Sequence, residues 1–498
     1  MSAEYGRREF CRRAVGAGAG VSTMSNSSLE AVGSSAAPAA TTDASDEWPV
    51  FGHDERNTSH LPGASSVTPP LTERWRLETP WAMESSYPIV DDDLVYCNTV
   101  GGMVTLSRRT GDPQWKAEAR GRPTSSPSAG PDAVYAGTGA GHVGELHDGG
   151  RRVVNYRIGS DVLSSPVPGS DGELFVATAD GAVRRLTRSG DGMQARWRTQ
   201  LADPLAGTPA LADGSLYVGD GDGVVHAIDA DTGTVDWRTD LGARCSASPA
   251  VADGRLYLPD DDGTLYALSL TDGSIVWRAA LGERGVPADA YASSPAVANG
   301  RVFVGSAEGT IHAFDAETGA ERWAFDAGAP VYLDPVVVGG TVYAGDVAGR
   351  VVGLTPDGSV AWETTVDGSV AGLAATATEL LVTATPGKVI AYGPDDADGA
   401  GVPADAESMA DDGRIDPPSS LLGDTVLLAV VIACLLVAVL GGLAGAVADG
   451  LREGRSNDRS GSGGKPHRHE SAGRRRDRLP DGDEYEVNDY GELVERDE

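Results

Sequence analysis

Lysine and cysteine are scarce in this chain, and each scarcity excludes a class of protein. Only three of its 40 basic residues are lysines (Lys116, Lys388 and Lys465), whereas Asp and Glu total 73 and bring the formal net charge to −33. An acidic surface of this kind repels phosphate backbones, so the composition excludes nucleic-acid binding. Four cysteines in separate parts of the sequence are too few for a disulfide framework.

The motifs of common catalytic and metal chemistries are also missing. The sequence has no Gly-x-Ser-x-Gly, no phosphate-binding loop, no Cys-x-x-Cys and no His-Glu-x-x-His. The carboxylate-rich stretches 220–223 and 260–263 lack the spacing of a calcium-binding loop, and we interpret them as hairpin turns. The sequence therefore predicts no catalytic residue, no cofactor and no metal site, and we expect a protein that is not an enzyme.

The two ends of the chain carry signals for export and for membrane attachment. Arg7 and Arg8 precede a weakly apolar Gly/Ala stretch, and residues 1–40 resemble a twin-arginine export signal; a disordered basic N-terminus is the alternative. Residues 425–448 contain 24 consecutive uncharged, mostly apolar residues. A helix of that length crosses a hydrocarbon core of about 30 Å, so we expect a transmembrane helix rather than a buried core helix.

The segments on either side of residues 425–448 predict the orientation in the membrane. Residues 394–420 are acidic and rich in Pro, Gly and Ala, which is typical of a disordered stalk. Residues 449–498 begin with a basic stretch that includes an arginine run at 474–476, and we expect them to form a disordered tail. Positive charge favours the cytoplasmic side, so we predict a single-pass cell-membrane protein with a cytoplasmic tail and an extracellular body.

The body of the chain, residues 46–393, is a repeat with a period near 40 residues. Tryptophans recur at 75, 115, 197, 237, 277, 323 and 362, with Tyr156 in an equivalent place. Each unit has four short apolar stretches separated by Gly-containing turns, which predicts a four-stranded sheet that must stack on its neighbours. Residues 372–392 supply only three strands, and residues 71–77 provide the missing one. We therefore predict an all-β fold, an eight-bladed β-propeller, with seven blades as the alternative.

The repeat motif also resembles that of a known family. The sequence Asp-x-x-Thr-Gly-x-x-x-Trp occurs at 229–237 and 315–323, and residues 48–58 resemble the segment that leads into such repeats. Both are similar to the PQQ-like (pyrroloquinoline-quinone repeat) propellers, a family that includes quinoprotein dehydrogenases and the assembly factor BamB. The resemblance implies that the repeat tryptophans wedge between blades and bond a neighbouring carbonyl through the indole N–H. These are Trp115, Trp197, Trp237, Trp277, Trp323 and Trp362.

The resemblance leaves two functions open. The adjacent cysteine pair of quinoprotein dehydrogenases is missing from this sequence. By analogy with BamB, we therefore expect a scaffold that binds a protein or glycan at the cell envelope, with a PQQ-dependent dehydrogenase as the alternative. Loops on one face of a repeat fold commonly carry binding. We expect Trp81, Tyr87, Tyr291 and Tyr332 to surround the channel mouth and contact a partner; packing within their own loops is the alternative.

The composition also predicts a salt-dependent stability. Few lysines combined with many carboxylates resemble proteins of salt-loving archaea, and at molar salt the screening length is about 3 Å, so carboxylates repel one another little. We expect partial unfolding in dilute buffer, because a net charge of −33 is then poorly screened. Thermal melting at low and at multimolar salt checks this, and equal melting temperatures would contradict it.

Overall fold

The computed structural model describes residues 47–63, 67, 69–79, 87–118, 120–147, 152–170, 172–189, 192–203, 205, 207–282, 292–394, 485–487 and 493–495. The chain divides into two compact units, Met1–Met409 and Ala410–Glu498, which we describe separately. In the second unit, β34 (Tyr485–Val487) and β35 (Leu493–Glu495) form an antiparallel hairpin. The predicted leader, the stalk beyond Pro394 and the predicted transmembrane segment lie outside the described residues. Within those residues, no helix has the length and apolar character needed to cross a bilayer.

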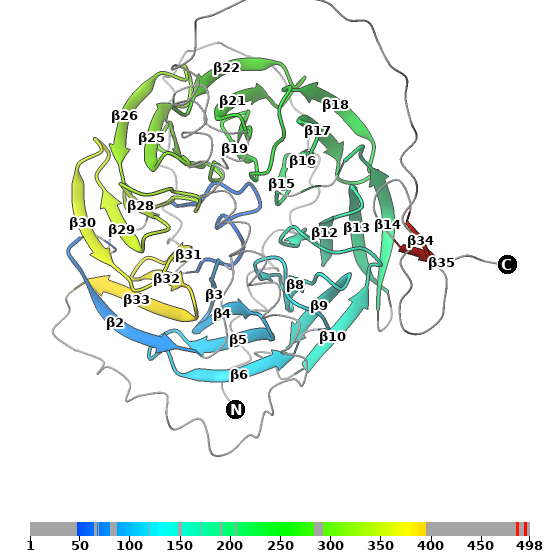
Figure 1. The fold of residues 1–498 in the computed structure, drawn as a ribbon, viewed down its shortest axis with the longest axis horizontal. Coiled ribbons are helices and arrows are strands. Elements are labelled where there is room, and N and C mark those ends of the chain that lie inside the picture. Colours follow the sequence, from blue (N-terminus) through cyan, green and yellow to red (C-terminus); the bar gives the residue numbers. More distant parts are fainter. Residues whose placement is uncertain are drawn as a thin grey trace, which may run out of the picture. The chain divides into compact units, whose positions relative to one another are not determined.

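The first unit is a ring of eight antiparallel sheets, which we call blades 1 to 8 (Figure 1). Each blade has four strands, and the first of them in blades 1 to 7 lies nearest the centre. In blade 8 the innermost strand is β31, and the outermost strand comes from the N-terminal side of the chain. This arrangement confirms the prediction of an all-β, eight-bladed propeller and excludes seven blades.

The strands follow the repeat of the sequence, with tight Gly-containing turns between them. Blades 1 to 4 consist of β3 (Ile89–Asp91), β4 (Leu94–Thr99), β5 (Gly102–Ser107), β6 (Pro113–Glu118); β7 (Ser128–Ala129), β8 (Val134–Gly137), β9 (His142–His147), β10 (Arg152–Arg157); β11 (Val167–Pro168), β12 (Glu173–Thr178), β13 (Ala182–Ser189), β14 (Gly192–Gln200); and β15 (Ala210–Ala212), β16 (Ser215–Gly219), β17 (Val224–Asp229), β18 (Val235–Asp240). Blades 5 to 8 consist of β19 (Ala250–Ala252), β20 (Arg255–Pro259), β21 (Thr264–Ser269), β22 (Ile275–Ala280); β23 (Ala296–Ala298), β24 (Arg301–Gly305), β25 (Thr310–Asp315), β26 (Glu321–Asp326); β27 (Val336–Val338), β28 (Thr341–Gly345), β29 (Arg350–Leu354), β30 (Val360–Thr365); and β31 (Val370–Ala375), β32 (Leu380–Ala384), β33 (Lys388–Pro394), β2 (Leu71–Glu78).

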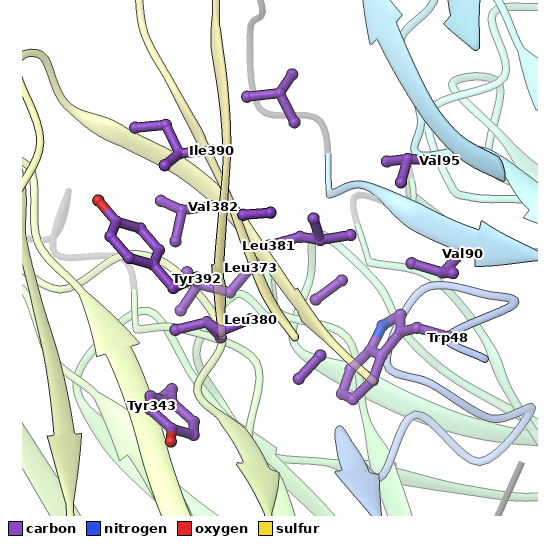
Figure 2. Packing of buried hydrophobic residues seen from close by; sticks show 14 of the residues in the cluster. Trp48, Val90, Val95, Tyr343, Leu373, Leu380, Leu381, Val382, Ile390 and Tyr392 are labelled. Carbon is purple, nitrogen blue, oxygen red and sulfur yellow. The ribbon is translucent and has the colours of Figure 1, made fainter. Parts of the chain in front are cut away.

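The ring closes because strands from the two ends of the domain share blade 8. Strand β2 pairs antiparallel with β33, from Leu71 opposite Pro394 to Glu78 opposite Lys388. The largest apolar cluster lies at the same closure, where Trp48 packs near Val90 and the buried leucines of blade 8 (Figure 2). Burial of this cluster therefore holds the first and last blades together.

A segment of the chain before the first blade fills the centre of the ring. Residues 48–61, which we call the plug, lie inside the circle formed by the innermost strands (Figure 1). Its carbonyl oxygens accept hydrogen bonds from the inner strands of six blades. The donors are Val90 N (to Trp48 O, 2.8 Å), Ala129 N (Pro49 O, 2.7 Å), Leu211 N (Glu55 O, 2.6 Å), Val251 N (Arg56 O, 2.9 Å), Val297 N (Thr58 O, 2.8 Å) and Val337 N (Ser59 O, 2.8 Å).

The pattern of these bonds follows from the edges of the sheets. An inner strand has no neighbouring strand on its channel side, so its channel-facing N–H groups need other partners. The plug supplies them, and its last residues form β1 (His60–Leu61), which pairs parallel with β27. In blade 3 the position that matches Val251 is Pro168, which has no N–H to satisfy.

The plug keeps its shape through two side chains. The Asp54 carboxylate accepts hydrogen bonds from the backbone N–H groups of Arg56 and Thr58, both at 3.0 Å. The Asn57 amide nitrogen donates to the carbonyls of Thr208 (3.1 Å), Pro209 (3.3 Å) and Pro249 (3.0 Å), and Asn57 has a φ of 54°. Asparagine tolerates this left-handed backbone better than most residues. Asn57 thus links the plug to two blades.

Replacing Asn57 tests how far the fold depends on the plug. We expect Asn57→Ala to lower the free energy of unfolding by about 2–4 kcal/mol, because it removes the donor for buried carbonyls. Asn57→Asp should cost more, since it places a carboxylate against carbonyl oxygens. Thermal unfolding in high salt measures both, with the exposed Glu55→Gln as the control. A plug that is dispensable would give all three variants the wild-type melting temperature.

Candidate functional site

The two faces of the ring differ in what they carry. The connections between consecutive blades and the turns between the second and third strands lie on one face, which we call the connection face. Hydrogen bonds such as Leu241 N to Gly223 O (2.9 Å) and Leu281 N to Gly263 O (2.8 Å) hold each connection against such a turn. Strand β33 runs away from this face, so Pro394 lies on the opposite one. The chain therefore continues toward the predicted stalk from the opposite face.

A closed circle of hydrogen bonds, the mouth ring, surrounds the channel on the connection face. Its members are the residues that precede proline at the start of the inner strands, and each backbone N–H donates to a side-chain oxygen of the next member. The links are Tyr87 N to Ser126 Oγ (3.2 Å), Ser126 N to Ser165 Oγ (3.1 Å), Ser165 N to Thr208 Oγ1 (3.1 Å), Thr208 N to Ser248 Oγ (2.8 Å), Ser248 N to Ser294 Oγ (3.0 Å), Ser294 N to Asp334 Oδ1 (2.7 Å) and Asp334 N to the Tyr87 hydroxyl (3.1 Å).

The last link differs from the others because it spans two blades. In blade 8 the corresponding position of the strand register is Gly372, opposite Thr383, and glycine has no side-chain oxygen. Tyr87 is long enough to bridge the gap from blade 1 to blade 7. Seven members thus close a circle around eight blades.

Burial dominates the electrostatics of this last link. Asp334 is 4% exposed, and burial raises the pKa of its carboxyl to about 7. Burial also holds the pKa of the Tyr87 hydroxyl well above its usual range, and the nearby Asp334 carboxyl adds to the effect. The Tyr87 ring packs edge-on against Phe51 of the plug, with ring centroids 5.2 Å apart. Tyr87 therefore connects the plug to the mouth ring.

The four aromatic residues expected to contact a partner do not all have the same surroundings. Tyr332 is 42% exposed on the connection between blades 6 and 7. Tyr87 instead directs its hydroxyl at Asp334. Trp81 and Tyr291 lie outside the described residues, as do Arg7 and Arg8 of the predicted export signal. Contact of these aromatics with a partner stays a prediction, and Tyr332 is the described member that is open to solvent.

The repeat tryptophans lie at the junctions between blades. In five of the six expected tryptophans, all but Trp115, the indole Nε1–H donates to a carbonyl at or next to the last turn of the next blade, 33 residues later in most repeats. The bonds are Trp197 to Ala230 (3.0 Å), Trp237 to Leu270 (2.9 Å), Trp277 to Ala316 (3.0 Å), Trp323 to Pro356 (3.0 Å) and, across the closure, Trp362 to Leu71 (2.9 Å). Trp75 makes the same bond to Arg108 (2.7 Å), although the expected set did not include it.

The glycine of the Asp-x-x-Thr-Gly turn explains why the motif ends as it does. Gly233 has a φ of 74°, and a Cβ atom placed on it would lie 2.6 Å from Cδ2 of Trp197. Only a residue without a side chain lets the indole lie flat on this turn. The turn and the tryptophan of the preceding blade are therefore one structural unit.

Blade 2 departs from this arrangement. In blade 4, Trp237 pairs with Ala227, the fourth residue of its strand. The fourth residue of the corresponding strand in blade 2 is Glu145, and it pairs with Val154. Tyr156 pairs instead with Val143. The alignment that put Tyr156 in the tryptophan position is therefore wrong by two residues. Blade 2 lacks the one-residue bulge that the other outer strands contain, which accounts for one of the two.

Polar contacts replace the indole at the next junction. The Tyr156 hydroxyl donates to the buried Glu145 carboxylate, which also contacts Arg188 of blade 3. On the other side of blade 2, the Trp115 Nε1 atom has no hydrogen-bond partner among the described residues. The position 33 residues beyond Trp115 falls within 148–151, outside that part of the chain.

The carboxylate-rich turns have a structural role in this fold. Asp220 Oδ1 accepts the Val224 N–H (2.9 Å), and Asp260 Oδ1 accepts the Thr264 N–H (2.7 Å), so each carboxylate closes its own hairpin turn. Across the described ranges, no group of three His, Cys, Asp or Glu side chains has the arrangement of a metal site.

The architecture and the tryptophan–glycine junctions define a β-propeller of the PQQ-like repeat class. The family model described as outer membrane protein assembly factor BamB matches residues 72–161, 179–294 and 268–401. The chain therefore belongs to this BamB-like family of PQQ-repeat propellers, as its motifs predicted. No curated protein matches the sequence.

Similar solved structures share the fold at low sequence identity. BamB from Moraxella catarrhalis is 19% identical, with a TM-score of 0.56, over 65% of this chain and 99% of that one. The computationally designed Ika8 protein is 15% identical, with a TM-score of 0.56, over 64% and 99%. A quinohemoprotein alcohol dehydrogenase from Comamonas testosteroni is 13% identical, with a TM-score of 0.59, over 74% and 83%. These likenesses show the fold alone.

Two glycine substitutions separate tryptophan docking from backbone strain. Gly233 and Gly214 both have positive φ, but a Cβ on Gly214 meets nothing within 4 Å. We expect Gly214→Ala to cost about 1 kcal/mol of unfolding free energy, and Gly233→Ala about 2–4 kcal/mol because it also displaces the Trp197 indole. Denaturant unfolding with tryptophan fluorescence measures both. Equal costs would show that the indole does not depend on the glycine.

Proposed function

We propose that this protein is a membrane-anchored, non-catalytic scaffold that binds a protein or glycan at the cell envelope through its connection face. The observation that carries the proposal is the difference between the two faces of the ring. The exposed Tyr332 lies beside the channel mouth on one face, while the chain leaves the propeller at Pro394 on the other. A tether on the opposite face leaves the connection face free for a partner.

Membership of the BamB-like family supports a scaffold, because the family model is described as an assembly factor. The anchor rests on the uncharged stretch 425–448 and the basic residues after it. The export signal rests on Arg7 and Arg8. Together they put the propeller outside the cell and the C-terminal tail in the cytoplasm.

The surface around Tyr332 exposes apolar side chains, which favours contact with a partner over contact with water. The Val347 side chain is 39% exposed on the adjoining turn of blade 7, and its backbone N–H donates to Pro330 O (3.1 Å) on the same connection as Tyr332. Aromatic residues flanked by apolar side chains are typical of the residues that dominate binding energy at interfaces. We therefore assign Tyr332 and Val347 to the centre of the partner surface.

The alternative, a quinone-dependent dehydrogenase, is supported by the fold it shares with the alcohol dehydrogenase. The donor set of this chain does not fit that cofactor. Its two described cysteines, Cys97 and Cys245, are far apart in the sequence, and both are buried as free thiols. The plug also fills the centre of the ring with its own backbone. Quinone-dependent dye reduction by the full-length protein, with PQQ and Ca²⁺ added, would contradict the scaffold proposal.

Tyr332→Ala tests the proposed surface. A partner captured from envelope extract by the full-length protein, and then identified and purified, should bind this variant about tenfold more weakly, because an exposed aromatic contact is lost. Ile275→Ala is the matched control: Ile275 is 44% exposed on the outer strand of blade 5, away from the channel mouth. Melting temperatures of both variants should stay at the wild-type value. Equal affinities for the two variants would place the partner elsewhere.

A further inference from the structure

We propose that Asp334 and Tyr87 form a pH-sensitive latch, which closes the mouth ring across blade 8 when Asp334 is protonated and loosens it when Asp334 is ionised. The latch belongs to the fold itself, so the inference does not rest on the proposed function.

The geometry makes this link the weak point of the mouth ring. Five of the seven members accept through a serine or threonine hydroxyl, which has no charge to gain or lose in the range of physiological pH. Asp334 is the ring member that titrates there, and it takes part in two consecutive links, accepting from Ser294 N (2.7 Å) and donating from its own N–H to Tyr87 (3.1 Å). Changing its charge therefore affects both links.

Among the described residues, no positively charged side chain forms an ion pair with Asp334. Its carboxyl interacts with the backbone N–H and the side chain of Ser294 and with the Tyr87 hydroxyl. Tyr87 is itself a weak acid, so the two groups that face each other across the gap are both harder to ionise there than in water. In the described part of the chain, a negative charge on Asp334 is consequently stabilised by hydrogen bonds from Ser294 and Tyr87 and by no ion pair.

The position of the latch gives it a structural consequence. Blades 7, 8 and 1 meet where the two ends of the domain are joined by β2 and β33. Asp334 precedes the inner strand of blade 7 and follows the exposed Tyr332 by two residues. Loosening the latch therefore frees the connection that carries Tyr332 and the seam on which ring closure depends.

The direction of the pH dependence follows from proton binding. The carboxyl has a pKa of about 7 in the closed ring and 3.8 when exposed. Between these values the closed form binds a proton that the open form has released, so raising the pH favours opening. From pH 5 to pH 7 the opening constant at the latch should rise about 50-fold, and above pH 7 it should level off.

Hydrogen exchange of the full-length protein at pH 5 to 8 tests the latch, with protection factors corrected for the intrinsic pH dependence of amide exchange. In the wild type we expect residues 331–338 to lose about 50-fold in protection from pH 5 to pH 7, while blade 5 changes little. Asp334→Asn, which keeps an acceptor but cannot ionise, should abolish the dependence. Asp334→Ser, which copies other ring members, provides a second non-ionising variant should the first not fold.

Two further variants distinguish the latch from general weakening. Tyr87→Phe should lower the protection of residues 331–338 at every pH, because the Asp334 N–H loses its acceptor. Ser248→Ala breaks a link that carries no ionisable group, so it should lower protection near blades 4 and 5 and leave the pH dependence at 331–338 as in the wild type. The proposal is overturned if the non-ionising variants keep the wild-type pH dependence, or if the loss of protection spreads evenly over all blades.

Discussion

The fold depends on satisfying the inner edges of its sheets. Eight innermost strands converge on one channel. Apart from β27, which pairs with β1 of the plug, none of them has a neighbouring strand on its channel side, so their backbone N–H groups need other partners. The plug carbonyls accept hydrogen bonds from N–H groups within the inner strands. The side-chain oxygens of the mouth ring accept from the N–H groups just before those strands, on the connection face. Both solutions cross from blade to blade, so the inner edges also hold the blades to one another.

The junctions between blades are set by a second constraint, the contact of an indole with a glycine turn. Trp237, for instance, bonds Leu270 O while its ring lies against Gly273 of the next blade. The interaction is local to each pair of blades and repeats around the circle. Blade 2 has no such indole contact. A hydrogen bond between the buried Tyr156 hydroxyl and the buried Glu145 carboxylate takes its place.

The proposed partner surface and the closure of the mouth ring lie on the same face of the propeller. The connection face carries the mouth ring, the exposed Tyr332 and the buried Asp334, all close to the seam between the first and last blades. The opposite face carries the turns between the third and fourth strands, which contact the tryptophans, and the end of the propeller at Pro394. In the function proposed for this protein, such an arrangement separates the attachment from the partner surface and puts the link between Asp334 and Tyr87 next to that surface.

The repeat in the sequence determined the class of fold, the number of blades and the strand that completes blade 8. It could do so because each four-stranded unit is specified by local turn chemistry, such as the Gly at 233 and the Trp at 237. In blade 2 the alignment was wrong: Tyr156 has the right spacing from the neighbouring tryptophans but lies two residues beyond the matching position. The absence of a bulge in β10 accounts for one of these residues, and spacing alone does not reveal a bulge.

The tertiary structure alone decided what lies in the channel. Nothing in the local sequence of residues 48–61 shows that their carbonyls face six blades, since those partners come from positions up to 278 residues away, as in Ser59 O to Val337 N. The same holds for Tyr87. Its aromatic character and loop position predicted either contact with a partner or packing within its own loop, and neither reading indicated that Tyr87 bridges to Asp334 across the blade in which Gly372 has no side-chain oxygen. Sequence patterns specify each blade because its contacts are local. Closing the circle brings distant residues together, so only the folded ring determines their roles.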